Sequence, residues 1–468
     1  MAATDDVRIR PPAPDVAPGA ALMPDQPAVP DATVPSARRV HRRFHPAWLV
    51  AAAAFVALLG AAGFRSAPSV MIVPLQAEFG WTRGLLSLAV SVNLVLFGLM
   101  APFAAALMDR FGVRAVVAAA LTLIAIGSGL AVLVRSAWQL VLLWGVVVGV
   151  GTGSMALVFA ATIANRWFVK RRGLVMGILT AGTATGQLIF LPLLAWVTEH
   201  VGWRTACLIV AGAALAVVPL VVIFLRSHPR DRGVLPYGAG PDFVAEEAAA
   251  PKDAVRRALR ALRVASRTRT FWALAGGFAI CGATTNGLIG THFIPAAHDH
   301  GLAETAAAGL LALVGVFDIL GTIGSGYLTD RFNPRVLLAV YYSFRGVGLV
   351  MLPGMLTNSL HPSMIGFVIV YGLDWVATVP PTAALCREAF GAAGTIVFGW
   401  VFAAHQLGAA VGSAVAGVLR DQTGSYTIAW FGAAGLCIVA AAVSIGIRRW
   451  PITAATSAAN AVPEQHHT

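Results

Sequence analysis

Charge is scarce in this sequence. Only 12% of its 468 residues are charged, about half the share found in an ordinary soluble domain. In contrast, 58% of the residues are hydrophobic. A water-soluble globule of this length needs more polar surface than the chain provides. The composition therefore excludes a soluble globular protein and requires most of the chain to face lipid or to pack inside a membrane bundle.

Motifs for covalent chemistry are also missing. The four cysteines are scattered, mostly within apolar runs, and no pair has the spacing of a metal site or a disulfide framework. There is no nucleophile elbow, zinc-ligand cluster or nucleotide-binding fingerprint. We therefore expect neither an enzyme nor a protein with a metal or cofactor.

The net charge of +12 does not indicate a nucleic-acid partner. The basic residues stand in short clusters between apolar segments, rather than along one face of a domain. Clusters of this kind are typical of the loops of a membrane protein, where they set the orientation of the chain.

One pattern occurs twice. An apolar run closes with Asp-Arg-Phe at Asp109, and a second apolar run closes with the same triplet at Asp330, 221 residues later. Gly177 and Gly202 correspond to Gly399 and Gly424 with an offset of 222 residues. An internal repeat of this size predicts two copies of one membrane unit.

Twelve apolar runs are long enough to cross a bilayer, which takes about 20 residues in a helix. We expect helices at 47–73, 84–107, 114–134, 138–161, 173–197, 203–225, 271–295, 305–328, 335–356, 362–385, 394–419 and 425–447. The sequence thus predicts an all-α membrane protein with twelve transmembrane helices in two six-helix pseudo-repeats.

The predicted loops differ in charge. Alternate loops hold most of the basic residues, whereas the opposite loops hold little more than Arg83, Arg135, Arg204 and Arg420. This bias places both termini in the cytoplasm. The Ala, Gly and Arg content and the compact loops favour an integral multi-pass protein of a bacterial inner membrane.

These predictions divide the chain into two helical bundles, one linker between them and two terminal tails. We expect a disordered cytoplasmic tail at 1–46, six-helix bundles at 47–226 and 271–449, a cytoplasmic linker at 227–270 and a cytoplasmic tail at 450–468. Within the linker, Lys252 to Arg269 predicts a basic helix. Two interpretations remain open: a helix on the membrane surface, with its arginines on anionic lipid and Val255, Leu259 and Leu262 facing inward, or a solvated linker helix.

Twelve spans in two halves, with an Asp-Arg motif after the second and eighth, resemble the major facilitator superfamily. The family's loop motif is matched at Ala105, Asp109, Arg110, Gly112 and Arg114, with Ala105 where the family has glycine, and again at Gly326, Asp330, Arg331 and Arg335. The resemblance implies a conformational latch formed by Asp109, Arg110, Arg114, Asp330, Arg331 and Arg335. Charges at helix ends suit contacts that break and re-form.

The segment that leads into the fifth run reads Trp-Phe-Val-Lys-Arg-Arg-Gly from Trp167, and the run itself contains Ala-Gly-Thr from Ala181. These two patterns are similar to a signature of the monocarboxylate transporter branch of that superfamily. The branch also carries a basic residue in its first helix, matched here by Arg65, and an Asp with an Arg four residues later in its eighth helix. The Asp is matched by Asp318, but the later position holds Thr322.

Charges within predicted spans are costly and usually mark function. Arg65, which precedes Pro68, is expected to bind a carboxylate, because a guanidinium matches that group with two hydrogen bonds. Snorkelling to the outer interface and pairing with Asp318 are alternatives. Asp318 and Asp374 are candidates for proton coupling, or else hydrogen-bonded packing residues, and Arg345 is expected to form an interhelical salt bridge.

Uncharged polar residues within the spans complete the candidate set. His292 is a further candidate for proton coupling, because histidine titrates near neutral pH. The candidates for substrate contact are His405 and the amides Asn93, Gln187 and Asn286. Each would otherwise be a packing residue or interhelical glue.

The sequence therefore predicts a monomeric secondary transporter that moves a small organic anion, a monocarboxylate, by alternating access with protons as the coupling ion. Its expected partners are the substrate, protons and membrane lipid. One alternative is a proton-driven exporter of drugs or other amphipathic compounds. Another is a transporter-like sensor that binds its ligand without carrying it.

Overall fold

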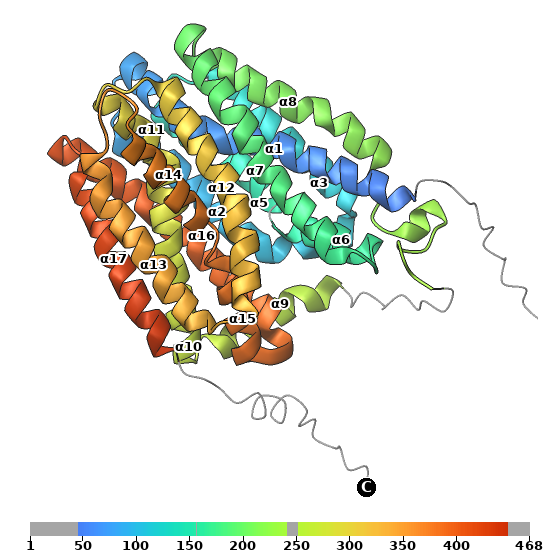
Figure 1. Ribbon diagram of the computed structural model, residues 1–468. Coiled ribbons are helices and arrows are strands. Elements are labelled where there is room, and N and C mark those ends of the chain that lie inside the picture. Colours follow the sequence, from blue (N-terminus) through green and yellow to red (C-terminus); the bar gives the residue numbers. More distant parts are fainter. Residues whose placement is uncertain (1–44, 156, 241–250, 448–468) are drawn as a thin grey trace, which may run out of the picture. The chain divides into compact units, whose positions relative to one another are not determined.

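The computed structural model describes residues 45–155, 157–240 and 251–447 (Figure 1). All of these described residues belong to one compact unit. The tails predicted at 1–46 and 450–468 lie outside the described residues, except for His45 and Pro46.

Within the described ranges, twelve helical segments are long and apolar enough to cross a membrane. In the first half the spans are α1 (Pro46–Phe79), α2 (Arg83–Phe111), α3 (Val113–Leu130) with η1 (Ala131–Leu133), the series α4 (Ala137–Leu140), η2 (Val141–Val148), α5 (Gly149–Ser154) and α6 (Leu157–Trp167), then α7 (Arg172–His200) and α8 (Trp203–Phe224).

The second half repeats this arrangement. Its spans are the series α10 (Arg269–Gly282), η4 (Ala283–Ile289) and α11 (Gly290–Asp299), then α12 (Glu304–Thr329), α13 (Pro334–Met351) with η5 (Leu352–Gly354), the pair α14 (Pro362–Asp374) and α15 (Val379–Phe390), and finally α16 (Gly394–Thr423) after η6 (Gly391–Ala393), and α17 (Thr427–Gly446). The twelve spans predicted from the apolar runs are confirmed, with ends that differ by a few residues.

The packing inside the two halves follows one scheme. In the first half α1 packs on α7, α3 on α8, and α2 on η2 and α5. In the second half α10 packs on α16, α13 on α17, and α12 on α14. These pairs correspond to one another when each helix is advanced by six spans, as expected for a repeated unit.

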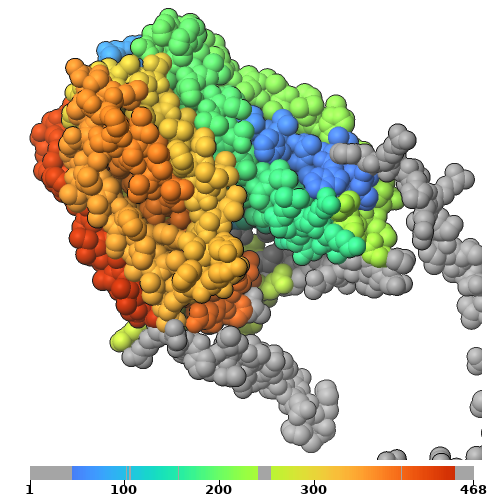
Figure 2. All heavy atoms as spheres, viewed as in Figure 1, coloured from blue at the N-terminus to red at the C-terminus, as the bar shows by residue number. Residues whose placement is uncertain are grey.

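Three further helix pairs join the halves: α2 with α16, α7 with α12, and α1 with α11. Figure 2 shows α7, in green, meeting α12, in yellow and orange, on the face in view. The walls of the central cavity come from helices of both halves, including α1, α2, α7 and α12.

Glycines in the fourth span allow a close approach to α2. A Cβ added to Gly145 would lie 2.9 Å from the side chain of Val92, and one added to Gly153 would lie 2.8 Å from Cβ of Met100. Small residues at a helix interface allow such close backbone approach. The close approach brings α2, which carries Asn93, against η2.

The linker contains η3 (Pro229–Arg232) and α9 (Pro251–Ala265). Helix α9 packs against α2 and α16, and Trp400 Nε1 donates to the carbonyl of Ala258 at 2.9 Å. Its arginines at 256, 257, 260 and 263 are exposed. Leu259, which the membrane-surface interpretation turns inward, is 48% exposed. Contact of α9 with lipid stays a prediction.

Candidate functional site

A cavity with about 1000 Å³ of empty space, part of it open to solvent, lies between the halves. Five of the residues predicted to act in substrate or proton binding line it: Arg65, Asn93, Gln187, Asn286 and Asp318. They come from α1, α2, α7, η4 and α12. Residues distant in the sequence therefore meet at one polar site within a mostly apolar wall.

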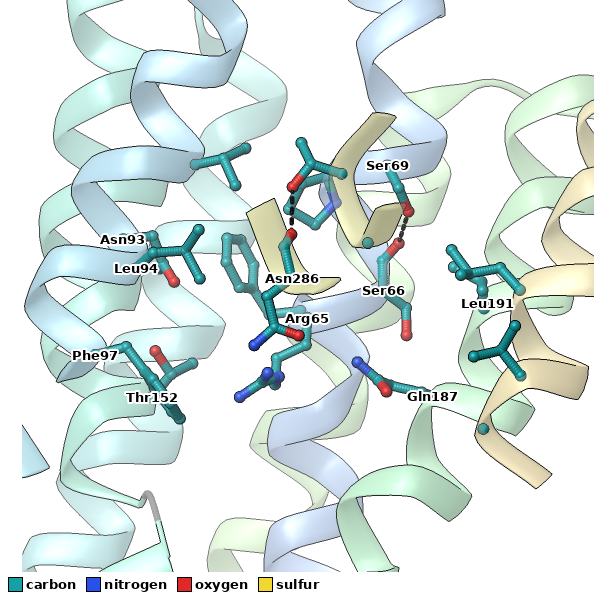
Figure 3. A pocket seen from close by; sticks show the side chains of 18 of the residues that line it. Arg65, Ser66, Ser69, Asn93, Leu94, Phe97, Thr152, Gln187, Leu191 and Asn286 are labelled. Atoms are coloured by element: carbon teal, nitrogen blue, oxygen red, sulfur yellow. Dashed lines mark hydrogen bonds between the residues drawn. The ribbon is translucent and has the colours of Figure 1, made fainter. Parts of the chain in front are cut away.

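Arg65 is the cation of this cavity among the residues that line it. Figure 3 shows its side chain in the space between α2 and α7. Its Cζ atom lies 4.8 Å from the centre of the Phe97 ring, a cation–π distance. Among the described residues its guanidinium has no ion-pair or hydrogen-bond partner. The pairing with Asp318 considered from the sequence is therefore not formed in this structure.

Prolines and serines near Arg65 give α1 a local shape that suits a binding site. Pro68 and Pro74 stand inside the helix, and each lacks the N–H that would complete a backbone hydrogen bond. Ser69 Oγ donates to the carbonyl of Ser66 at 3.2 Å. Ser66, Pro68 and Ser69 lie within about one turn of Arg65 and line the same cavity.

The two π-helical segments bring polar groups to the cavity. Asn93 Nδ2 donates to the carbonyl of Trp144 in η2 at 2.8 Å, and Thr291 Oγ1 donates to the carbonyl of Asn286 in η4 at 2.9 Å. Wide π turns free carbonyl groups from the regular helical pattern and are frequent at functional sites. Here each of these two carbonyl groups accepts a hydrogen bond from a side chain.

Gln187 and Asn286 keep their side-chain amides available. Both are half-buried and line the cavity. Figure 3 shows them near the guanidinium of Arg65 in this view. Unlike Asn93, neither side chain forms a hydrogen bond with another described residue. An amide supplies two N–H donors and one oxygen acceptor, so this corner of the cavity offers several donors beside one positive charge.

Asp318 connects the cavity to a break in the tenth span. Its Oδ1 accepts from Thr322 Oγ1 at 3.1 Å and from the backbone N–H of Val376 at 3.1 Å. Val376 lies between α14 and α15, where the helix is interrupted. Thr322 occupies the position where the resembled branch has arginine, and its hydroxyl binds the carboxyl group instead.

Asp374 is the last residue of α14, next to this break, and is not among the residues that line the cavity. Arg345 Nε donates to its Oδ2 at 2.6 Å, and the pair is almost completely buried. Arg345 also donates to Cys281 Sγ at 2.8 Å and to the carbonyl of Trp375 at 3.3 Å. The interhelical salt bridge predicted for Arg345 is confirmed.

Neither candidate histidine lines the cavity. His405 is packed between the rings of Phe278 and Phe402. His292 is fully buried, and its ring nitrogens lie 3.0 Å from the hydroxyl of Tyr426 and 2.9 Å from the carbonyl of Ser413. His292 therefore belongs to a second polar cluster near the ends of α2, α11 and α16.

We call this second cluster the Arg83 cluster. Arg83 donates to both carboxylate oxygens of Asp299 at 2.7 Å and to Tyr426 at 3.1 Å. The backbone N–H groups of Arg83 and Gly84 donate to Asp421. The cluster joins the start of α2 to helices of the other half and closes one end of the interface. Arg83, predicted from the sequence to lie in a loop, is the first residue of α2, and the local sequence pattern does not reveal its partners.

The opposite end of the interface is held differently. Asp109 forms an ion pair with Arg166 inside the first half, and Arg335 pairs with Glu388 inside the second half at 3.2 Å. Among the described residues no ion pair joins the halves at this end.

The remaining residues assigned to the latch have other surroundings. Arg110 lies over the Phe111 ring and Arg331 over the Tyr327 ring. Arg114 lines a small pocket with Arg226 and Ser227, and Asp330 follows the last residue of α12. Their action as a latch stays a prediction.

Comparison with known proteins identifies the family. Residues 53–398 match the sequence model of the Major Facilitator Superfamily. An uncharacterized MFS-type transporter of Bacillus subtilis, YcxA, is 27% identical over 429 residues, which cover 90% of this chain and 98% of that protein. Monocarboxylate transporter 13 of Bos taurus is 27% identical over 411 residues, covering 85% of this chain and 88% of that protein.

A solved structure has the same fold. The bacterial homologue of the human lysosomal transporter Spinster, in an inward-facing and unoccupied conformation, superposes with a TM-score of 0.65 at 17% identity, covering 87% of this chain and 99% of that one. Family match, twelve apolar helices and shared fold lead to one conclusion: the chain belongs to the Major Facilitator Superfamily of transporters and is an integral multi-pass membrane protein.

Proposed function

We propose that this protein carries a small organic anion, a monocarboxylate, across the membrane by alternating access, coupled to protons. The observation that carries the proposal is the guanidinium of Arg65, which lines a cavity between the halves without an ion-pair partner among the described residues. A cation kept in a largely apolar cavity is costly unless an anion binds there.

The surroundings of Arg65 favour a carboxylate. A guanidinium binds both oxygens of a carboxylate with parallel hydrogen bonds, and the amides of Gln187 and Asn286 add donors in the same cavity. The resemblance to monocarboxylate transporters agrees with this chemistry. Asn93 acts mainly by holding α2 to η2, because its N–H group is bonded to Trp144.

Alternating access requires contacts between the halves that break and re-form. The Arg83 cluster closes one end, whereas the ion pairs at the Asp109 end stay within each half. With the termini in the cytoplasm, as the charge bias indicates, the Asp109 end faces inward and this conformation is closed to the outside. The residues assigned to the latch would pair across the halves in the opposite state.

Asp318 is the proposed site of proton coupling. It lines the same cavity as Arg65 and is hydrogen-bonded to the broken tenth span through Val376. A proton on this carboxyl group offsets the charge of a bound anion, so the loaded carrier moves less net charge across the membrane. Asp374 and His292, held by Arg345 and by Tyr426, act as supports for the broken span and the Arg83 cluster.

The rest of the proposal concerns organisation. We place a six-helix bundle at 47–226, a cytoplasmic linker at 227–270 and a second bundle at 271–449, in a protein that works as a monomer in a bacterial inner membrane. Helix α9, with its exposed arginines, lies on the cytoplasmic side in this orientation.

Uptake of radiolabelled monocarboxylates into proteoliposomes with an imposed inward proton gradient tests the proposal. We expect uptake by the wild type, none by Arg65→Ala, and partial uptake by Arg65→Lys, which keeps the charge but loses the two-point hydrogen bonding. Arg135→Ala, an exposed arginine outside the cavity, is the matched control. Absence of carboxylate flux together with export of a cationic dye would replace this proposal with the drug exporter.

A further inference from the structure

The polar groups of the cavity are few, and most are already used. The hydroxyl of Ser69 donates to Ser66 and that of Thr152 to the carbonyl of Val148, while Thr291 donates to Asn286. Beyond Arg65 and the amides of Gln187 and Asn286, few N–H or O–H donors in the lining are free to bind a ligand. A substrate rich in hydroxyl groups would leave those groups without partners, and each unmet buried donor or acceptor is unfavourable.

The single acidic group of the lining, Asp318, restricts the number of carboxylates that a substrate can carry. Asp318 is held in place by Thr322 and Val376, and Arg65 is the cation among the lining residues. A second carboxylate on the substrate would have no cation to bind and would lie in a cavity that already contains an acidic side chain. The lining therefore disfavours dicarboxylates.

Aromatic rings supply much of the remaining wall, and they come from both halves. Phe64, Phe97 and Trp144 line the first-half side, and Trp375 lines the second-half side. Phe64 and Trp144 meet edge to face with their ring centres 5.8 Å apart. Trp375 is half-buried, so part of its ring is accessible to a ligand.

Trp375 is held at the helix break by two charged groups. Arg345 donates to its carbonyl at 3.3 Å, and the next residue, Val376, donates to Asp318. Its ring lies 3.8 Å from the position of a Cβ on Gly290, another residue of the lining. The indole is thus a positioned wall of the cavity rather than a loose side chain.

We propose that the substrate is a monocarboxylate with a bulky apolar body, an aryl carboxylic acid, whose carboxylate binds Arg65 and whose ring packs on Trp375. This inference rests on the proposed function and narrows its substrate class. Burial of an aromatic ring against apolar walls favours such an acid over a short-chain one by roughly tenfold or more in affinity.

Competition against a labelled carboxylate in proteoliposomes measures this preference in the wild type. We expect phenylacetate to compete roughly tenfold or more better than acetate, and gluconate and succinate to compete more weakly than phenylacetate. Equal competition by phenylacetate and acetate, or stronger competition by gluconate or succinate, would overturn the inference while leaving carboxylate transport intact.

Variants of Trp375 test whether its indole ring causes the preference for phenylacetate over acetate. The ratio of the phenylacetate and acetate affinities should fall in Trp375→Ala, persist in Trp375→Phe and stay unchanged in Trp138→Ala, a tryptophan that is 65% exposed outside the cavity. An unchanged ratio in a folded Trp375→Ala would refute the role of the indole. A wild type that binds no carboxylate, and is indifferent to Arg65→Ala, would remove the proposed function itself.

Discussion

Arg83 and Asp299, 216 residues apart in the sequence, face each other through two parallel hydrogen bonds of 2.7 Å. The arginine begins α2 in the first half, and the aspartate ends α11 in the second. The side chains of both residues are mostly buried. This pair joins the two halves at one end of the interface.

Loss of the aspartate charge should open this end of the protein. Removing one partner of a buried ion pair costs about 3–5 kcal/mol, so Asp299→Asn should shift the population towards the conformation in which the Arg83 cluster is broken. Spin labels on the exposed residues Leu85 and Ile428 should report a longer distance between α2 and α17.

Two further variants control this measurement. Arg83→Gln, which removes the other charge of the pair, should lengthen the same distance, and Arg135→Gln, which removes an exposed arginine outside the cluster, should leave it unchanged. An unaltered distance in Asp299→Asn would mean that the other contacts between α2 and α16 hold this end closed without the Arg83–Asp299 ion pair.

Asp318→Asn should separate transport from proton coupling. Asparagine keeps an oxygen to accept from Val376 but carries no proton that can be released. We expect exchange of labelled for unlabelled substrate to persist and accumulation driven by a proton gradient to be lost. Thr322→Val removes the hydroxyl donor and keeps the carboxyl group, and it should retain driven uptake. Driven uptake by Asp318→Asn would exclude this residue as the proton carrier.

Asp374→Leu should destabilise the protein more than the double variant Arg345→Met with Asp374→Leu. The single change leaves a buried arginine without its counter-ion, at a cost of about 3–5 kcal/mol, whereas replacing both partners removes the unpaired charge. Thermal unfolding in detergent compares the three proteins. Equal destabilisation by the single and double variants would show that the ion pair contributes little beyond its packing.

Gly282→Ala should prevent normal packing of α10 against α16. A Cβ at this position would lie 2.7 Å from the carbonyl carbon of His405, a backbone atom that cannot turn aside. Gly276→Ala, on the same helix, meets nothing within 4 Å and serves as the control. Size-exclusion chromatography should show loss of the monodisperse protein only for the first variant. A monodisperse Gly282→Ala protein would mean that the two helices separate without loss of the fold.

Local sequence properties were sufficient for the helices. Each predicted span is an apolar run of membrane-crossing length, and backbone hydrogen bonding inside lipid leaves helix as the available structure for such a run. The repeat with its 221-residue offset predicted the shared packing scheme, because two copies of one membrane unit pack their helices in the same arrangement. The interhelical role of Arg345 followed from the cost of an isolated charge in a span.

The tertiary structure decided which polar side chains contact one another and which line the cavity. The sequence marked Arg65, Gln187 and Asn286 as polar residues within spans, but only the packing of α1, α7 and η4 showed that they share one cavity. The sequence likewise gave no reason to pair Arg83 with Asp299, or to expect that His292 and His405 lie outside the cavity lining. A side chain's direction depends on helix rotation and on the π-helical and broken segments, which pack against helices that are distant in the sequence. The sequence alone determined the membrane fold and its repeat, whereas contacts between helices far apart in the chain decided which of its polar residues face the substrate cavity.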